Sequence, residues 1–207
     1  MNIVPASTPL VIKKMFPNYV WNIETDQNAL YLTFDDGPTP GVTEWVLDIL
    51  QKFNAQATFF CIGDNIKKYP DIFKKIVANG HTVGNHTHNH LKGWKTPTPS
   101  YLRNVEQAQQ TINQKPSLFR PPYGKLKPKQ GTELTKLGYK IIMWSVLSFD
   151  WDKSISQSDC FNNVKNHANP GGIIVFHDSL KAENNLRYAL PKTLEYFKEK
   201  GFTFKKL

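Results

Sequence analysis

The apolar residues of this chain alternate between two spacings. Runs of consecutive apolar residues, typical of buried strands, are followed by segments in which apolar residues recur every three or four positions, as on one face of a helix. Residues 29–34 show the first pattern, residues 42–53 show the second, and the alternation continues to the C-terminus. We predict strands at 29–34, 56–61, 81–84, 118–119, 140–144, 172–176 and 202–204, and helices at 42–53, 70–78, 101–112, 131–137, 160–167 and 190–197.

Strands separated by helices of this length need crossover connections, which make the sheet parallel. About seven such units predict an α/β fold with a closed or nearly closed β/α barrel; an open doubly wound sheet is the alternative. Either fold collects function at the carboxyl ends of its strands, but only the barrel gathers all of them around one mouth. Because no repeat, low-complexity tract or linker is present, we expect one domain at residues 29–207 and an N-terminal extension, residues 1–28, packed on it.

The composition excludes two classes of protein. Apolar residues make up 40% of the 207 positions, too many for a disordered chain, and no apolar run approaches the ~18 residues that cross a bilayer. The 26 Lys and Arg outnumber the 17 Asp and Glu, but they are scattered without interleaved aromatic residues. We therefore expect a solvated basic surface, no nucleic-acid partner and no membrane span. Two cysteines, Cys61 and Cys160, are too few for a disulfide framework and are expected to be free buried thiols.

The first 21 residues do not resemble a secretory leader. A leader has a basic start followed by about 7–15 apolar residues, whereas here the apolar stretch at residues 9–12 is short and precedes Lys13 and Lys14. We therefore expect a cytoplasmic protein, or an extracytoplasmic one if a natural leader has been removed.

Polar residues of the types used in metal binding and acid–base chemistry follow almost every predicted strand. Because the carboxyl ends of parallel strands share one edge, we expect these residues to lie together. They are Asp35 and Asp36 after the first strand, His86 and His90 after the third, Arg120 after the fourth, Asp150 and Trp151 after the fifth, and His177 and Asp178 after the sixth.

Asp35, Asp36 and the nearby histidines suit a metal site. The Gly37–Pro38 turn lets both carboxylates point into one site, so that one binds a metal while the other takes a proton; an ordinary turn is the alternative. His86 and His90 are four residues apart, so one helical turn would place both imidazoles on one side and His88 on the other. Two neutral imidazoles and one carboxylate make a metal site with open positions. A solvated His-rich loop is the alternative.

The segment from Arg120 to Gly124 contains two prolines that stiffen the backbone. Arg120 could pair with an active-site carboxylate, and the backbone amide of Tyr123 could donate to an oxyanion. A structural turn with a surface arginine is the alternative.

His177 ends a hydrophobic strand, and strand alternation places the aliphatic Val175 on the same face. A histidine in this position suits a general acid, with its pKa adjusted by a carboxylate such as Asp150. A core histidine with its hydrogen bonds satisfied is the alternative.

The five motifs, in this order between Thr33 and Asp178, resemble those of the polysaccharide deacetylases, the carbohydrate esterases of family four. The resemblance implies a distorted, incompletely closed (β/α)7-like barrel, with residues 29–207 as the catalytic domain. It also implies a role for each candidate residue. Asp35 would be the catalytic base, His177 the acid, Arg120 the partner of Asp35 and Asp150 that of His177; Asp36, His86 and His90 would bind the metal; and Pro121, Tyr123, Trp151 and Val175 would contact the substrate.

A metal-dependent hydrolase that removes N- or O-linked acetyl groups from a polysaccharide or oligosaccharide is the function this resemblance implies. Chitooligosaccharide, peptidoglycan glycan and xylan remain open as substrates, and we expect a monomer. One divalent ion is expected, zinc first, with cobalt, nickel or manganese as alternatives. It would lower the pKa of a water molecule, whose proton Asp35 would take, while His177 would protonate the leaving group. The presence of Asp36 favours this branch over the allantoinase-like amidohydrolases, which dispense with the metal.

Two positions depart from the family pattern. Leu147 stands where the fourth motif often has an extra Asp, with Asp152 as a candidate substitute, and Val175 stands where the fifth motif usually has Leu. Both changes concern substrate range, and the first also concerns the partner of His177. Trp94, just past the His segment, is interpreted either as a stacking surface for a sugar or as a loop anchor.

Three rival functions remain. One is another metal-dependent carbon–nitrogen hydrolase of the same superfamily. The second is a sugar-binding relative without turnover, against which the presence of both Asp35 and His177 argues. The third is an iron(II) oxygenase, which can use two histidines and a carboxylate but is usually an all-β protein.

Overall fold

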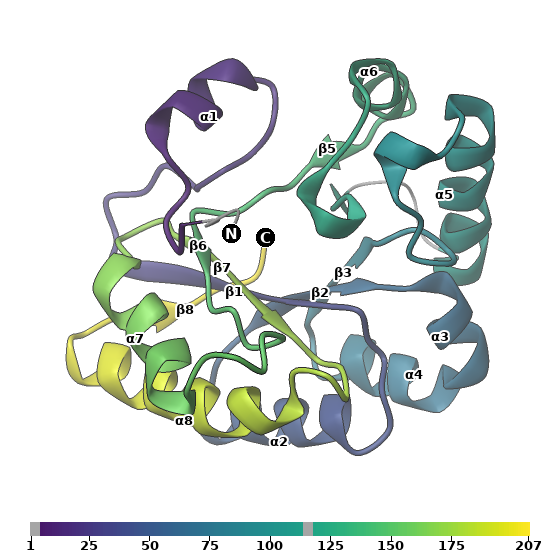
Figure 1. Cartoon of the computed structure of the whole chain (residues 1–207). Coiled ribbons are helices and arrows are strands. Elements are labelled where there is room, and N and C mark those ends of the chain that lie inside the picture. The colour runs from purple at the N-terminus through teal and green to yellow at the C-terminus, as the bar shows by residue number, and fades with distance from the viewer. Residues whose placement is uncertain (1–4, 114–117) are drawn as a thin grey trace.

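A computed structural model of the chain describes residues 5–113 and 118–207, and these form one curved parallel sheet with helices around it (Figure 1). Seven strands are hydrogen-bonded in the order β5-β4-β3-β2-β1-β7-β6, and β8 pairs with the start of β1. The predicted α/β fold, an incompletely closed (β/α)7-like barrel in a single domain, is therefore confirmed. The strands are β1 (Ala29–Asp35), β2 (Ala57–Cys61), β3 (Thr82–Asn85), β4 (Leu118–Phe119), β5 (Lys140–Ile141), β6 (Val146–Leu147), β7 (Ile173–His177) and β8 (Thr203–Phe204).

Most helices cover the outer side of the sheet, with α8, α2 and α4 along its lower side in Figure 1 and α5 and α6 at the far end. No helix within the described residues is both long enough and apolar enough to span a bilayer. The helices are α1 (Leu10–Met15), α2 (Val42–Lys52), α3 (Gly63–Lys68), α4 (Pro70–Ala78), α5 (Thr98–Ile112), α6 (Pro128–Lys136), α7 (Gln157–His167) and α8 (Glu183–Glu199), with short 3-10 turns η1 (Gly93–Lys95) and η2 (Pro122–Gly124).

Strand β1 lies at the centre of the sheet between β2 and β7 and is buried along its whole length. One of its faces packs beneath the helices, where the ring of Phe34 stacks on Phe59 and Phe176 at centroid distances of 5.1 and 6.1 Å. Side chains alternate between faces, so Asp35 points to the opposite side, into the barrel. The register pairs Asp35 with His177, which brings the ends of β1 and β7 together at the mouth.

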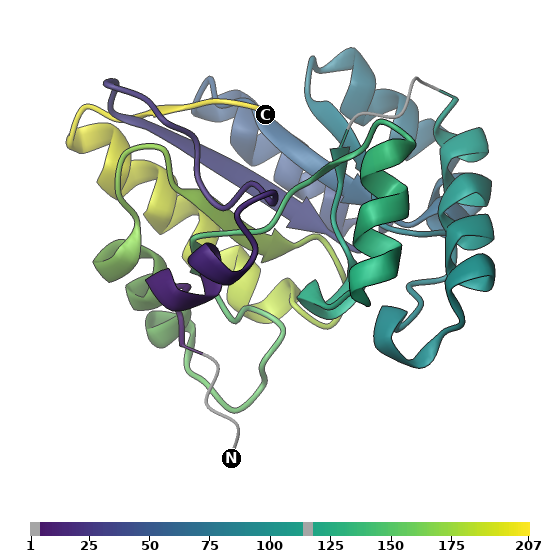
Figure 2. The same ribbon diagram turned by 90° about the horizontal axis from the view of Figure 1, so that it is seen from above.

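The barrel is open between β5 and β6, and the N-terminal segment fills this opening (Figure 2). Residue Val20 bridges to Ile142 in parallel, and Ser7 bridges to Val146 in antiparallel. The extension expected at residues 1–28 thus contacts the sheet where its course is described; residues 1–4 lie outside the described residues.

The strand predicted at 140–144 was wrong in extent, because regular pairing covers only Lys140–Ile141. The backbone carbonyls of Ile142 and Met143 accept hydrogen bonds from the buried Arg120 side chain at 3.2 and 2.9 Å, and so do not pair with a neighbouring strand. A second strand, β6, follows after the interruption. Neither β6 nor the short helices α1 and α3 were predicted, since each has at most six residues and too little periodicity to recognise.

His81, just before β3, is a buried histidine that must be neutral to fit. Its Nδ1 accepts a hydrogen bond from the backbone N–H of Ala57 at 3.2 Å, and its ring packs against Phe59. Burial, with a smaller effect of Lys206, lowers the pKa of His81 from 6.5 to about 4.

Acid should therefore weaken the fold through His81. Between pH 6.5 and pH 4 the unfolded chain takes up a proton that the folded chain refuses, so this stabilisation, present above pH 6.5, is lost as the pH falls. We expect His81 to lower the free energy of unfolding by roughly 2 kcal/mol between pH 7 and pH 5. Urea unfolding at both pH values, compared with His81→Asn, measures this contribution. An equal pH dependence in the two proteins would contradict it.

Candidate active site

Three side chains that could hold a metal ion converge at the mouth of the barrel. Asp36 lies just after β1, and His86 and His90 follow β3. The Asp36 carboxylate oxygen Oδ1 lies 3.6 Å from Nε2 of His86 and 3.2 Å from Nε2 of His90. One ligand atom from each of the three residues falls within 4.8 Å of the others, and His88 is outside this group. The structure thus brings together the three residues that the sequence assigned to a metal.

The state of these side chains fits a divalent cation. Nδ1 of His86 lies 2.7 Å from the backbone carbonyl of Arg120, which can only accept, so this nitrogen donates and Nε2 is the ring nitrogen that a neutral His86 would offer to a metal. Burial, together with the neighbouring His86, lowers the pKa of His90 to about 4, so His90 is neutral. Oδ1 of Asp36 is buried and receives no hydrogen bond within the described residues. A carboxylate oxygen and two neutral imidazoles are the donor set expected for zinc or a related ion.

The histidines do not lie on a helical turn as predicted. The segment after β3 is irregular, and Thr87 and His90 have positive φ angles of 65° and 53°. Side chains hold this shape: Oδ1 of Asn85 accepts the N–H of Thr87, and Oδ1 of Asn104 accepts the N–H groups of His88 and Asn89. The spacing of four residues brings the imidazoles together through this loop, and their ring centroids lie 5.1 Å apart.

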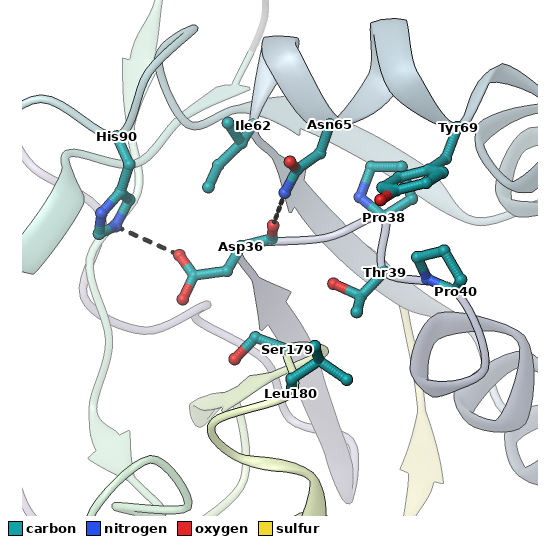
Figure 3. Close-up of a pocket in the computed structure, with 10 residues that line it drawn as sticks. All are labelled: Asp36, Pro38, Thr39, Pro40, Ile62, Asn65, Tyr69, His90, Ser179 and Leu180. Carbon is teal, nitrogen blue, oxygen red and sulfur yellow. Dashed lines mark hydrogen bonds and ion pairs between the residues drawn. The ribbon is translucent and has the colours of Figure 1, made fainter.

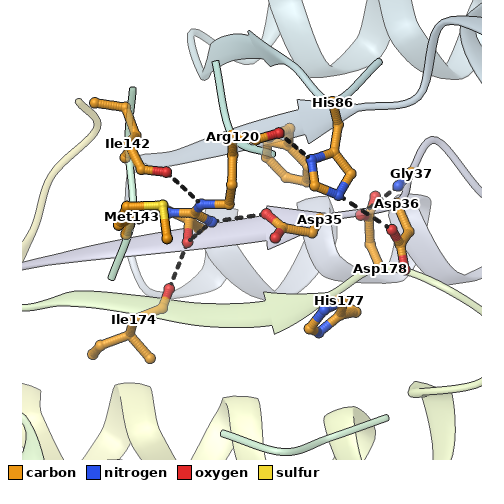
Figure 4. A network of polar contacts seen from close by, with 12 residues as sticks. Asp35, Asp36, Gly37, His86, Arg120, Ile142, Met143, Ile174, His177 and Asp178 are labelled. Carbon is orange, nitrogen blue, oxygen red and sulfur yellow. Dashed lines mark hydrogen bonds and ion pairs between the residues drawn. The ribbon is translucent and has the colours of Figure 1, made fainter. Parts of the chain in front are cut away.

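Asp35 is held by an arginine inside the barrel (Figure 4). Arg120 is fully buried, and its Nη1 donates to Oδ1 of Asp35 at 2.8 Å and to Oγ1 of Thr33 at 2.7 Å. Its remaining nitrogens donate to the carbonyls of Ile142 and Met143. Each nitrogen of the guanidinium therefore has a hydrogen-bond partner, and the Asp35 carboxylate is fixed in one place.

The electrostatic surroundings keep Asp35 ionised. Burial alone would raise its pKa, but the opposing effects of Arg120, His86 and His177 outweigh burial and hold the pKa below its ordinary value. An ionised carboxylate at this position is a proton acceptor.

His177 and Asp150 form a second pair on the other side of the mouth. Nδ1 of His177 lies 2.8 Å from Oδ1 of Asp150, and the backbone N–H of His177 donates to the second carboxylate oxygen at 2.6 Å. Burial would lower the pKa of His177, but the charge and hydrogen bond of Asp150 overcome this and raise it to about 9. The Nε2–H of a protonated His177 can therefore donate a proton. Trp151 lies edge-on to this imidazole at a centroid distance of 4.7 Å.

The other residues assigned to the substrate lie around these pairs. Tyr123 is half-exposed, and its ring lies 4.7 Å from that of His90. Trp94 packs edge-on against Tyr123 at 5.5 Å. Val175 is buried on the strand face that also carries His177, and Pro121 is buried at the start of η2.

Asp152, considered as a substitute partner for His177, instead accepts hydrogen bonds from the backbone and hydroxyl of Ser154. Leu147, at the other departure from the family pattern, is buried in β6. Asp150 is therefore the carboxylate that holds His177 in this structure.

Asp178, to which we assigned no specific role from the sequence, fixes the loop carrying Asp36. Its buried carboxylate accepts the N–H of Gly37 at 3.0 Å and the hydroxyl of Thr43 at 2.5 Å. A Cβ on Gly37 would lie 1.9 Å from a carboxylate oxygen of Asp178, so only glycine permits this contact. From the other side, Asn65 donates to the backbone carbonyl of Asp36 at 2.7 Å. Asp178 was among the polar residues that follow a predicted strand, whereas no sequence pattern pointed to Asn65.

Comparisons with known proteins found a family match, similar sequences and a similar structure. Residues 22–142 match the family model described as polysaccharide deacetylase. A peptidoglycan-N-acetylglucosamine deacetylase of Bacillus cereus is 35% identical over 191 residues, spanning 90% of this chain and 69% of the relative. A chitooligosaccharide deacetylase of Azorhizobium caulinodans is 34% identical over 161 residues, spanning 75% of this chain and 76% of the relative. The crystal structure of a peptidoglycan N-acetylglucosamine deacetylase in complex with 4-naphthalen-1-yl-N-oxidanyl-benzamide has a TM-score of 0.89 and 32% identity, and covers 97% of this chain and 95% of that chain.

Proposed function

Because this chain belongs to the polysaccharide deacetylase family, we propose that it hydrolyses the N-acetyl groups of a glycan with the help of one divalent metal ion. One observation carries the proposal. Asp35 and His177 occupy paired positions at the ends of β1 and β7, where Arg120 holds the carboxylate and Asp150 holds the imidazole. Beside them lie three side chains that could hold a metal ion. A base, an acid and a metal site at one mouth are the parts that metal-assisted hydrolysis of an amide requires.

Asp36, His86 and His90 would hold the ion. When bound, a divalent ion of this kind polarises a carbonyl oxygen and lowers the pKa of water toward neutrality. Asp35, kept ionised by Arg120, takes the proton of the attacking water. The backbone N–H of Tyr123 is the candidate donor to the developing oxyanion. His177 then passes a proton from Nε2 to the leaving nitrogen, while Asp150 stabilises the imidazolium.

The relatives favour an N-acetylated sugar as the substrate. The two relatives described above are named for deacetylation of peptidoglycan N-acetylglucosamine and of chitooligosaccharide. In both of these substrates the reacting group is an acetamide on a sugar ring. An amine is a poor leaving group unless it is protonated, which gives His177 a definite task.

Acetate release from N-acetylchitooligosaccharides and from peptidoglycan glycan, followed with metal analysis of the same sample, tests this proposal. We expect about one ion per active chain, loss of activity in EDTA, and its return on adding zinc or cobalt. Full activity in protein free of metal would contradict the metal requirement. Failure of the metal-loaded protein to release acetate from any glycan would instead favour the sugar-binding relative without turnover.

The iron(II) oxygenase has no support in this structure. The residues lie on a parallel β/α barrel, and the family match identifies hydrolytic relatives.

A further inference from the structure

The three candidate metal ligands come from two separate loops. Asp36 lies in the loop after β1, and His86 and His90 lie in the loop after β3. Ligands that are already held close together bind an ion more tightly, because less freedom is lost on binding. One segment contacts both loops. It consists of residues 62–65, the start of α3 with the residue before it, and we call it the α3 bracket.

The α3 bracket holds the loop after β3 through backbone hydrogen bonds. The N–H of Gly63 donates to the carbonyl of Thr87 at 3.0 Å, and the N–H of Asp64 donates to the carbonyl of His88 at 3.0 Å. Both N–H groups lie in the first turn of α3, where a helix offers them no internal partner. A Cβ on Gly63 would lie 2.6 Å from Nδ1 of His88, so this close approach depends on glycine.

The α3 bracket also holds the loop after β1. The backbone N–H of Ile62 donates to the carbonyl of Gly37 at 2.9 Å, and the side-chain amide of Asn65 donates to the carbonyl of Asp36 at 2.7 Å (Figure 3). Asp36 has a φ angle of 82°, which residues other than glycine rarely adopt. Contacts from outside the loop are needed to maintain such a conformation.

Asp178 holds the same loop from the β7 side (Figure 4). Its backbone N–H donates to the carbonyl of Asp35 at 3.1 Å, and its carboxylate accepts the N–H of Gly37. The backbone on both sides of Asp36 is therefore fixed. In contrast, the buried Oδ1 of Asp36 has no hydrogen-bond partner within residues 5–113 and 118–207, so the protein leaves this oxygen available to an ion.

We propose that Asn65 is a positioning residue of the metal site, which raises the affinity for a divalent ion by holding Asp36 in place. This inference rests on the proposed metal-dependent function. The amide of Asn65 is directed at the carbonyl of Asp36, so Asn65 acts through this residue and is not itself a ligand.

The Kd for zinc, measured on the metal-free full chain by competition with a chromogenic chelator, tests the proposal. Loss of a group that orients a metal ligand typically costs 10–100-fold in metal affinity, and we expect a loss of this size in Asn65→Ala. Asn65→Leu keeps most of the side-chain volume without the donor, and it should show the same loss. A normal Kd in Asn65→Leu would show that the hydrogen bond is not the cause.

Gln157→Ala is the matched control. Gln157 is half-buried like Asn65, and its side-chain amide also donates to a backbone carbonyl, that of Asn184 at 2.8 Å, but this bond joins α7 to α8. The control should bind zinc like the wild type. Urea unfolding of the metal-free proteins should show similar losses of stability in Gln157→Ala and Asn65→Ala, so that only a positioning role accounts for a difference in Kd.

The cobalt-loaded proteins provide a second readout. The visible absorption spectrum of bound cobalt depends on ligand geometry, and it should differ from the wild type in Asn65→Ala and not in Gln157→Ala. An unchanged zinc Kd in Asn65→Ala, or an equal loss in Gln157→Ala, would overturn the positioning role. A wild-type chain that binds neither zinc nor cobalt would instead overturn the proposed metal dependence, and this inference with it.

Discussion

Asp35→Asn is expected to abolish most acetate release while leaving the metal content unchanged. Asp35 faces Arg120 and is not one of the three converging ligand residues, so the substitution removes a proton acceptor and no metal ligand. Loss of a general base typically costs about 10²–10⁴-fold in rate. Asn keeps the shape of the side chain and an oxygen that can accept from Nη1 of Arg120.

His90→Ala provides the contrast for Asp35→Asn. His90 supplies one of the three ligand atoms, so its removal should lower metal content and activity together. Metal analysis and acetate release on both purified variants distinguish the two roles. Because Asp35 neutralises a fully buried arginine, thermal unfolding must show that Asp35→Asn remains folded at the assay temperature. Equal metal loss in the two variants would show that the assignments of Asp35 and Asp36 are confused.

The rate lost in His177→Ala should depend on the leaving group of the substrate. An N-acetyl sugar must release an amine, which cannot depart without a proton, so we expect a loss of about 10²–10⁴-fold. An activated aryl acetate has a leaving group that needs no proton, so the rate of the variant on this substrate should fall about tenfold or less. Initial rates on both substrates measure the difference. An undiminished rate on the N-acetyl sugar would exclude His177 as the acid.

Asp150→Asn tests the support of this acid. The substitution removes the charge beside Nδ1 of His177 and should destabilise the imidazolium, with a smaller loss than His177→Ala. In the His177→Ala background the same change should have little effect, because the group it acts on is gone. Losses that multiply in the double variant would show that the two residues act independently.

The fold, and the closeness of the candidate residues in it, could be predicted from the sequence for one physical reason. Parallel strands end at a common edge, so residues such as Asp36 and His86, 50 positions apart, come together once the strands are recognised. The strands themselves are recognisable because a central strand such as β1 is buried on both faces and reads as a continuous apolar run.

What the sequence could not show depends on contacts between distant segments. The loop after β3 follows from hydrogen bonds to Asn85 and Asn104, and a spacing of four residues is equally compatible with the helical turn that we expected. The interruption after β5 is caused by Arg120, which lies 22 and 23 positions before the two carbonyls that it binds. Asn65 carries no local pattern, because its place is set by how α3 packs beside the loop after β1.

The N-terminal segment across the opening of the barrel also determines how far the chain can be shortened and still fold. The backbone N–H of Leu147 donates to the carbonyl of Ala6 at 2.8 Å, and the N–H of Thr8 donates to the carbonyl of Ser145 at 2.9 Å. A chain cut to begin at β1 would contain every motif residue yet would present β6 as a bare sheet edge, a template for pairing with other molecules. We therefore expect a chain shortened to the motif-bearing residues alone to aggregate. Domain swaps or fusions should include residues 5–28 together with the barrel.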